Sequence, residues 1–168
     1  INSNVEGAAQ VIHIDKHDRA LGILPFFHSF GYMLLWFYAR HKAGIVFHPS
    51  PLDVGAIGEL CSRYRISLLV VTPTFLQLYQ RRCTPEQFSN LRVVLTGAEK
   101  LPLRLAQSFQ DRFGIVPVEG YGVTECAPVI AANCPDFRAS GFFQVASRRG
   151  TVGQPLPGVS VRIVDPDT

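Results

Sequence analysis

The chain has 168 residues, of which 47% are apolar and 17% charged, and its formal net charge is +3 at pH 7. This length suits one domain of ordinary size. The small charge and the lack of basic runs argue against a nucleic-acid-binding function, and the most apolar window, from Phe30 to Ala39, is far shorter than the ~20 residues of a membrane span.

The first half of the chain alternates predicted helices with short apolar runs. Ser3 and Glu6 have the spacing of a capping box, which predicts the start of a helix. The window Phe30–Ala39 indicates a helix buried under a sheet, with a helix that lies on a membrane or lines an acyl chain as alternatives. A strand is predicted over Ala43–Pro49, and Asp53 is the predicted N-cap of the next helix.

The second half repeats this alternation. The apolar runs Ile66–Val71 and Leu91–Gly97 predict buried strands, and Thr72 followed by Pro73 predicts a helix start between them. A further helix is predicted over 101–114, ending at Gly114. Later strands are predicted over residues 115–122, 129–133 and 159–165, and a mobile loop over residues 136–149.

Continuous apolar strands between amphipathic helices are typical of a sheet that is buried on both faces. The pattern therefore predicts an α/β fold with a doubly wound, mainly parallel sheet and helices on both faces. Ligands of such sheets bind at the carboxyl ends of the strands.

Two loops at predicted carboxyl ends carry residues suited to a nucleotide. One is TGAEKLP, which begins at Thr96, and the other is EGYGVTECAPV, which begins at Glu119. We expect the glycines of both loops (Gly97, Gly120 and Gly122) to let the backbone approach a ligand closely, with positive φ where needed. Taken alone, such glycines are equally typical of ordinary turns.

The second loop also offers an aromatic ring, a hydroxyl and a carboxylate. Tyr121 presents a flat face to a base, Thr124 is able to donate to a phosphate oxygen, and Glu125 is able to hold a hard cation such as Mg²⁺. A Thr-Glu pair also commonly opens a helix. Together these residues indicate a site for a magnesium-bound nucleotide.

Four segments occur in an order and spacing that resemble the adenylate-forming superfamily of acyl-CoA synthetases, luciferases and peptide-synthetase adenylation domains. They are LPFFHSFG, TGAEKLP, EGYGVTECAP and RGTVGQPLPG, and the resemblance covers essentially the whole chain. Within the superfamily the sequence most resembles acyl-acyl-carrier-protein synthetases that are joined to a 2-acylglycerophosphoethanolamine acyltransferase.

The resemblance implies a reaction in which a fatty acid and ATP give an acyl-adenylate, and a thiol of CoA or of acyl carrier protein then takes the acyl group. The implied cofactors are ATP, with AMP as product, and Mg²⁺. Implied roles are adenine binding by Gly97, Ala98 and Glu99, stacking by Tyr121, an α-phosphate contact by Thr124, and a magnesium ligand at Glu125. His28 corresponds to a position near the substrate carboxylate, although the residues alone favour a packed histidine at the end of a strand.

The resemblance further implies that residues 1–168 are a middle slice of the AMP-binding domain. A phosphate loop is expected before residue 1 and a lysine-bearing domain after Thr168. We expect the isolated chain to be inactive and prone to self-association, and the complete protein to be cytoplasmic, with the inner face of the plasma membrane as a further location. The alternatives are a non-catalytic nucleotide- or acyl-binding module and a membrane-docking interaction domain.

Cysteines and histidines outside these loops suggest little further chemistry. The four cysteines show no CxxC spacing, which indicates reduced thiols. His13 and His17 have metal-like spacing, but no other cysteine or histidine completes a set, so we expect a solvated helix exit. Cys126 adjoins the second loop without a partner base, and we expect a small packed residue.

Overall fold

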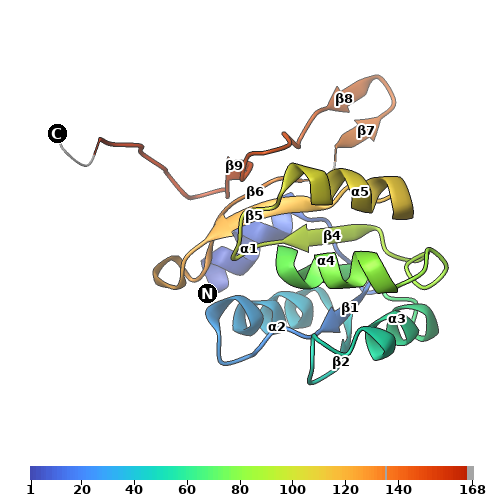
Figure 1. The fold of residues 1–168 in the computed structure, drawn as a ribbon. Coiled ribbons are helices and arrows are strands. Elements are labelled where there is room, and N and C mark those ends of the chain that lie inside the picture. The colour runs from blue at the N-terminus through green and yellow to red at the C-terminus, as the bar shows by residue number, and fades with distance from the viewer. Residues whose placement is uncertain (135, 166–168) are drawn as a thin grey trace.

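The computed structural model describes residues 1–134 and 136–165 and centres on a seven-stranded sheet in the order β2-β1-β3-β4-β5-β6-β9 (Figure 1). Five strands are parallel: β1 (Arg19–Gly22), β2 (Gly44–Phe47), β3 (Leu68–Val71), β4 (Val93–Thr96) and β5 (Val118–Gly122). Two antiparallel strands, β6 (Val129–Ala132) and β9 (Gln154–Pro155), extend the sheet beyond β5. The predicted α/β fold with a mainly parallel sheet is confirmed.

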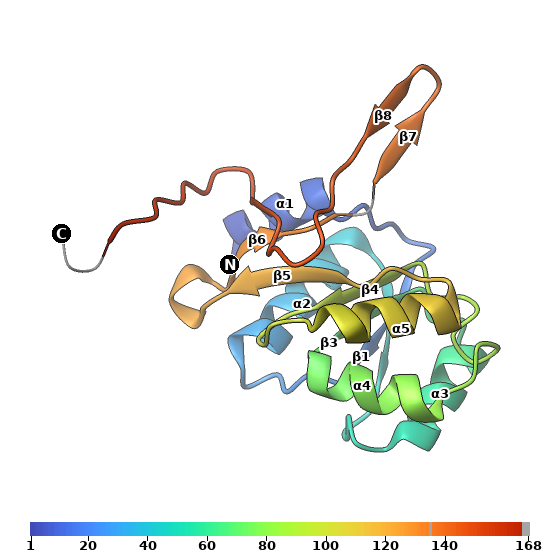
Figure 2. The same cartoon turned by 45° about the horizontal axis from the view of Figure 1, so that its top comes forward.

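Helices cover both faces of this sheet, as predicted (Figure 2). One face carries α1 (Asn2–Val11) and α2 (Ser29–His41), and we call it the α1–α2 face. The other, the α3–α5 face, carries α3 (Val54–Arg63), α4 (Pro73–Arg82) and α5 (Leu103–Phe113). None of the helices in the described ranges is long and apolar enough to span a bilayer.

Successive residues of the central strands serve opposite faces, because side chains alternate along a strand. Val71 and Val94 join the core under α3, α4 and α5. Their neighbours Val70 and Val93 join the core under α1 and α2. All four are buried, which explains why β3 and β4 are uninterrupted apolar runs in the sequence.

Several predicted helix ends are confirmed. An Asp53 carboxylate oxygen accepts a hydrogen bond from the Ala56 amide at 3.2 Å and caps α3. Pro73 lies in the first turn of α4, and Gly114 ends α5 with a φ of 72°, in the left-handed region that glycine adopts without strain.

The predicted capping box is wrong. Helix α1 begins at Asn2, so Ser3 and Glu6 both lie inside it, and no side chain caps its start. Glu6 instead forms an ion pair with Arg40 of α2, with 2.8 Å between its Oε1 and the arginine Nε. The Glu6 carboxylate therefore links α1 to α2 and does not cap α1.

Two further predictions fail in the last third of the chain. Residues 159–165 form no strand, and Ile163 is 95% exposed, because this segment leaves the sheet after β9 (Figure 2). The stretch predicted as a mobile loop contains a two-stranded hairpin of β7 (Phe137–Ala139) and β8 (Phe142–Gln144). Strand β1, which the sequence did not predict, lies between β2 and β3.

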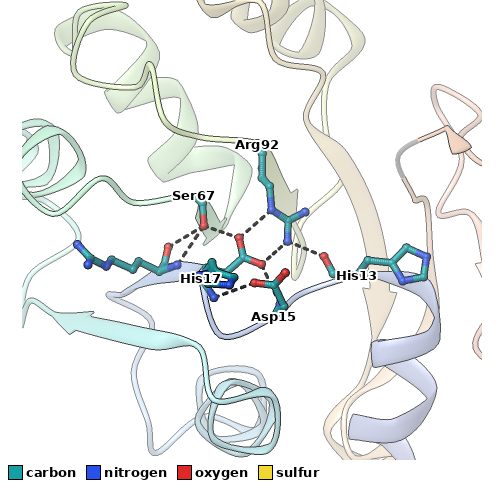
Figure 3. A network of polar contacts seen from close by, with 7 residues as sticks. His13, Asp15, His17, Ser67 and Arg92 are labelled. Carbon is teal, nitrogen blue, oxygen red and sulfur yellow. Dashed lines mark hydrogen bonds and ion pairs between the residues drawn. The ribbon is translucent and has the colours of Figure 1, made fainter. Parts of the chain in front are cut away.

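A polar network fastens the amino ends of the strands together (Figure 3). The buried Asp18 carboxylate accepts hydrogen bonds from Ser67 Oγ at 2.7 Å and Arg92 Nε at 2.8 Å, and Arg92 also donates to the His13 carbonyl. Burial of Asp18 tends to raise its pKa, but the hydrogen bonds from Arg92 and Ser67 outweigh burial and hold that pKa below its usual range. The network ties the segment after α1 to β1, β3 and β4.

His13 and His17 lie at this network and not on a helix (Figure 3). The backbone amide of His17 donates to Asp15 at 2.7 Å. Across residues 1–134 and 136–165 there is no group of three or more His, Cys, Asp or Glu side chains arranged to hold a metal ion.

Candidate functional site

A cavity of about 320 Å³ lies between the sheet and helices α1 and α2. Its apolar lining includes Val11 and Ile14 near α1, Met33 and Phe37 of α2, and Val93 of β4. Other lining residues lie at the carboxyl ends of β4 and β5 and in the first turn of α2: His28, Ser29, Gly97, Ala98, Gly120, Tyr121, Gly122 and Thr124. Because most of this second group is partly or fully exposed and the strand residues at the amino ends are buried, the cavity opens at the carboxyl edge of the sheet.

His28 is fixed at this opening by the start of α2. It is the N-cap residue, and its Nδ1 accepts a hydrogen bond from the Phe30 amide at 3.3 Å. A neutral imidazole that accepts at Nδ1 carries its proton on Nε2. His28 therefore has an Nε2–H that is able to donate to an acidic group in the cavity.

Thr124 is joined to the same helix. It begins the short 3₁₀ helix η1 (Thr124–Cys126) directly after β5, and its hydroxyl lies 3.0 Å from the hydroxyl of Ser29. Ser29 is the first residue of α2. The start of α2 thus carries both His28 and the Ser29 hydroxyl, and this hydroxyl contacts the loop after β5.

Asn4 of α1 holds the other side of this loop. Its amide Nδ2 donates to the Val129 carbonyl at 2.6 Å and to the Cys126 carbonyl at 3.4 Å, and its Oδ1 accepts from the Val129 amide at 3.1 Å. The side chain therefore pairs with Val129 much as a neighbouring strand would. The motifs in the sequence did not indicate a role for Asn4. The one signal of it is a polar residue one turn before Ala8 on the apolar face of a helix.

The loop glycines are required by the protein's own packing. A Cβ on Gly122 would lie 2.2 Å from the Pro128 carbonyl oxygen, and a Cβ on Gly97 would lie 3.1 Å from the ring of Phe30. Neither of them, nor Gly120, has a positive φ, which corrects that expectation. The left-handed positions of these two loops are Ala98 and Ala127.

The two predicted site carboxylates lie outside the cavity lining and differ in their partners. Glu99 accepts hydrogen bonds from the Thr74 amide at 3.2 Å and the Thr74 hydroxyl at 2.6 Å, in the first turn of α4. Glu125 is exposed, and its carboxylate has no hydrogen bond or ion pair within the described ranges. An exposed carboxylate without a protein partner is available to a hard cation such as Mg²⁺.

Two other residues of the second loop are open to solvent. Tyr121 is 48% exposed and lines the cavity, so its ring is able to contact a planar ligand there. Cys126 is exposed, so the expectation of a packed cysteine is wrong. The reason is that none of the three residues of η1 is buried.

Comparisons with known proteins point to one family. The family model described as "AMP-binding enzyme" matches residues 1–168. The chain is 31% identical over 134 residues to the p-hydroxybenzoic acid–AMP ligase FadD22 of Mycobacterium tuberculosis, covering 79% of this chain. It is 28% identical over 176 residues to 4-coumarate–CoA ligase 2 of Oryza sativa subsp. japonica, covering all of it. The ATP-bound structure of MatB from Rhodopseudomonas palustris superposes with a TM-score of 0.85 and 26% identity over 99% of the chain.

These proteins are much longer than this chain. It spans 18% of FadD22, 29% of the rice ligase and 31% of MatB. The similarity therefore concerns one part of each of these proteins.

Proposed function

Since the chain belongs to the AMP-binding enzyme family, we propose that it is part of an AMP-forming acid–thiol ligase that activates a fatty acid. The acyl group would pass to a thiol, that of CoA or of acyl carrier protein. The motif resemblance further supports a complete protein in which the ligase works with acyl carrier protein and is joined to an acyltransferase of phospholipid metabolism.

The observation that carries this proposal is the apolar cavity with polar groups at its opening. Burial of an acyl chain is worth about 0.8 kcal/mol per CH₂ group, so a channel lined by Met33, Phe37 and Val93 favours an aliphatic tail. His28 and Thr124 lie at the opening, where the carboxylate of such an acid and the phosphates of a nucleotide would meet.

In the proposed first step a carboxylate oxygen of the acid attacks the α-phosphorus of ATP. An O–P bond forms, the bond to the β-phosphate oxygen breaks, and pyrophosphate leaves. The His28 Nε2–H would orient the attacking carboxylate, and the Thr124 hydroxyl would donate to an α-phosphate oxygen as charge shifts. In the second step a thiolate attacks the acyl carbonyl and AMP leaves.

Tyr121 and Glu125 would bind the nucleotide and its metal. The ring of Tyr121 would stack on the base, beside the backbone of Gly97 and Ala98. Glu125 would hold Mg²⁺, which neutralises phosphate charge when bound. Glu99 is proposed at the adenine end of the site, where its contacts with Thr74 fix the loop after β4.

An aromatic acid is the second candidate substrate. FadD22 and the rice ligase are named for p-hydroxybenzoic acid and 4-coumarate. The phenyl rings of Phe30 and Phe37 in the cavity lining would also suit an aromatic ring. The fatty acid remains the first candidate because the sequence motifs most resemble those of acyl-acyl-carrier-protein synthetases.

The two non-enzymatic alternatives have less support. A membrane-docking helix requires the apolar side of α2 to be exposed, yet Met33, Leu34, Phe37 and Tyr38 are buried against the sheet. A module that binds nucleotide without chemistry has no need for the unpaired carboxylate of Glu125.

Pyrophosphate release by the complete gene product that contains this sequence tests the proposal. We would compare straight-chain fatty acids, 4-coumarate and p-hydroxybenzoate, each with ATP and MgCl₂, and then CoA against holo-acyl carrier protein. We expect the fatty acids to be used with the highest kcat/KM. Release with aromatic acids alone would overturn the fatty-acid assignment, and no release with any acid would overturn the ligase assignment.

Glu125→Gln tests the metal role in the same assay, because it keeps the size of the side chain and removes its charge. We expect turnover to fall at least 10-fold and the Mg²⁺ requirement to rise. Glu59→Gln, at an exposed glutamate of α3, is the matched control. A magnesium titration of Glu125→Gln that overlays that of the wild type would contradict the role.

A further inference from the structure

We propose that Ser29 is a positioning residue that donates its hydroxyl proton to Thr124 and so leaves the Thr124 proton free for an anionic oxygen of the nucleotide. The inference rests on the proposed function for the identity of that anion. It concerns a residue for which neither the motifs nor the comparisons indicate a role.

The geometry isolates these two hydroxyls as a pair. Ser29 Oγ and Thr124 Oγ1 lie 3.0 Å apart, although 95 residues separate them in the sequence. Within the described ranges neither oxygen has another hydrogen-bond partner in the protein. Each hydroxyl has one proton and is able to accept two hydrogen bonds, so only one of the two donates in this contact.

The direction of donation decides what Thr124 is able to do for a phosphate. If Thr124 donated to Ser29, it would present only lone pairs to the cavity opening, and these repel an anionic oxygen. If Ser29 donates, the Thr124 proton is available for a charge-assisted hydrogen bond, which is roughly twice as strong as a neutral one. An approaching phosphate therefore favours the arrangement in which Ser29 is the donor.

The place of Ser29 in the fold makes it suited to this task. It is the first residue of the 13-residue helix α2, directly after His28. The same helix turn thus fixes the imidazole on the acid side of the cavity and the hydroxyl that orients Thr124 on the phosphate side. A shift of α2 would move both groups together, which keeps the two reactants in register.

A double-mutant cycle in the complete gene product tests the proposal. Ser29→Ala and Thr124→Val are made singly and together, and pyrophosphate release is measured with ATP, MgCl₂ and decanoate. We expect Ser29→Ala to lower kcat about 2- to 10-fold, the range of one neutral hydrogen bond, with a smaller change in the KM for ATP. In the Thr124→Val background the same substitution should change kcat less than about twofold, because the partner hydroxyl is already gone.

Two further variants separate positioning from general structure. Ser29→Thr keeps the hydroxyl and should retain kcat within about twofold. Ser62→Ala, at an exposed serine of α3, should leave all parameters unchanged. An equal loss from Ser29→Ala in both backgrounds, or no loss in either, would overturn the proposal.

Hydrogen exchange of the same proteins keeps the test independent of the ligase assignment. We expect Ser29→Ala, but not Ser29→Thr, to speed amide exchange in residues 123–127, while exchange in β3 stays constant. If the wild type releases no pyrophosphate with any acid, the proposed function fails. Exchange then decides the role of Ser29 alone, and unchanged exchange in residues 123–127 would refute it.

Discussion

The two faces of the sheet are made by the same strands but serve different purposes. On the α3–α5 face the rings of Tyr79, Phe88 and Phe109 are fully buried, and the ring centroids of Phe109 and Phe113 lie 4.6 Å apart. On the α1–α2 face strand residues of the same kind border a cavity of about 320 Å³.

The difference shows that a uniform apolar pattern is able to produce both a close-packed core and a binding surface. Val70 and Val71 are adjacent in β3 and both buried, yet one borders the cavity and the other belongs to the closed core. Stability should therefore depend mainly on the α3–α5 face and ligand binding on the α1–α2 face. Three substitution experiments test this division.

The largest effect on stability is expected from removing an aromatic ring on the α3–α5 face. Phe109→Ala should lower the free energy of unfolding by about 3–5 kcal/mol, because the ring is fully buried among Phe88 and Phe113. Phe30→Ala, at a half-buried ring on the cavity, should cost about 1–2 kcal/mol. Urea unfolding measures both, with the 95% exposed Phe27→Ala as control. Equal losses at Phe109 and Phe30 would break the comparison.

A smaller effect is expected from adding one methylene group to neighbouring valines. Val71→Leu should cost about 1–3 kcal/mol, because Val71 is fully buried in the core under α3, α4 and α5 and an added carbon would overpack it. Val70→Leu should change stability by less than about 0.5 kcal/mol and lower the affinity for a fatty acid, because the added carbon extends into the cavity. Thermal unfolding and titration with decanoate provide the two readouts. A similar destabilisation by both substitutions would show that the α1–α2 face is packed as closely as the α3–α5 face.

The smallest effect on stability is expected from a rise in pH that ionises a buried thiol on the α3–α5 face. Burial, with a contribution from nearby Cys83, raises the pKa of Cys61 from 9.0 to about 12. The unfolded chain therefore loses this proton first as pH rises, and stability should fall above about pH 9, by roughly 1 kcal/mol per pH unit. Cys61→Ala should reduce this slope.

Cys126→Ala is the matched control for that experiment, since Cys126 is exposed. Denaturant titrations between pH 8 and pH 10.5 give the slope for each variant. An unchanged slope in Cys61→Ala would mean that the buried thiol does not contribute to the alkaline loss of stability.

Local patterns in the sequence predicted the central architecture. Strands β3 and β4 lie in apolar runs of the sequence. Asp53 caps α3 and Gly114 ends α5, and each contacts backbone groups only three or four residues away, at Ala56 and Gln110. Strand β1 was missed because only Ala20 and Leu21 are apolar in it, between Arg19 and Gly22. The alternation in 159–165 predicted a strand, but no neighbouring strand pairs with it in the described ranges.

Part of the site could also be predicted from sequence. The carboxyl-edge rule predicts that the loops after β4 and β5 lie near each other, and the structure brings Gly97, Tyr121 and Thr124 to one cavity with His28. The residues that hold the loop after β5 in place could not be predicted from sequence. Ser29 and Asn4 bond to this loop, and their partners are 95 and 125 residues away in the sequence. Contacts of that span depend on the assembled fold and leave only a weak local signal.

The bonds from Asn4 to Val129 also set an order of events during protein synthesis. At 5–20 residues per second, the ribosome adds Val129 about 6–25 s after Asn4, because 125 residues separate them. Until then α1 lacks its hydrogen bonds to Val129, although Glu6 is able to pair with Arg40 of α2 earlier. We expect the apolar side of the helix, with Val5 and Ala8, to stay available to chaperones. Cross-linking of stalled nascent chains to trigger-type chaperones should therefore persist at α1 until residues beyond 132 have emerged. Helix α1 is made before α2 to α5, yet it is among the last of them to be fixed in place.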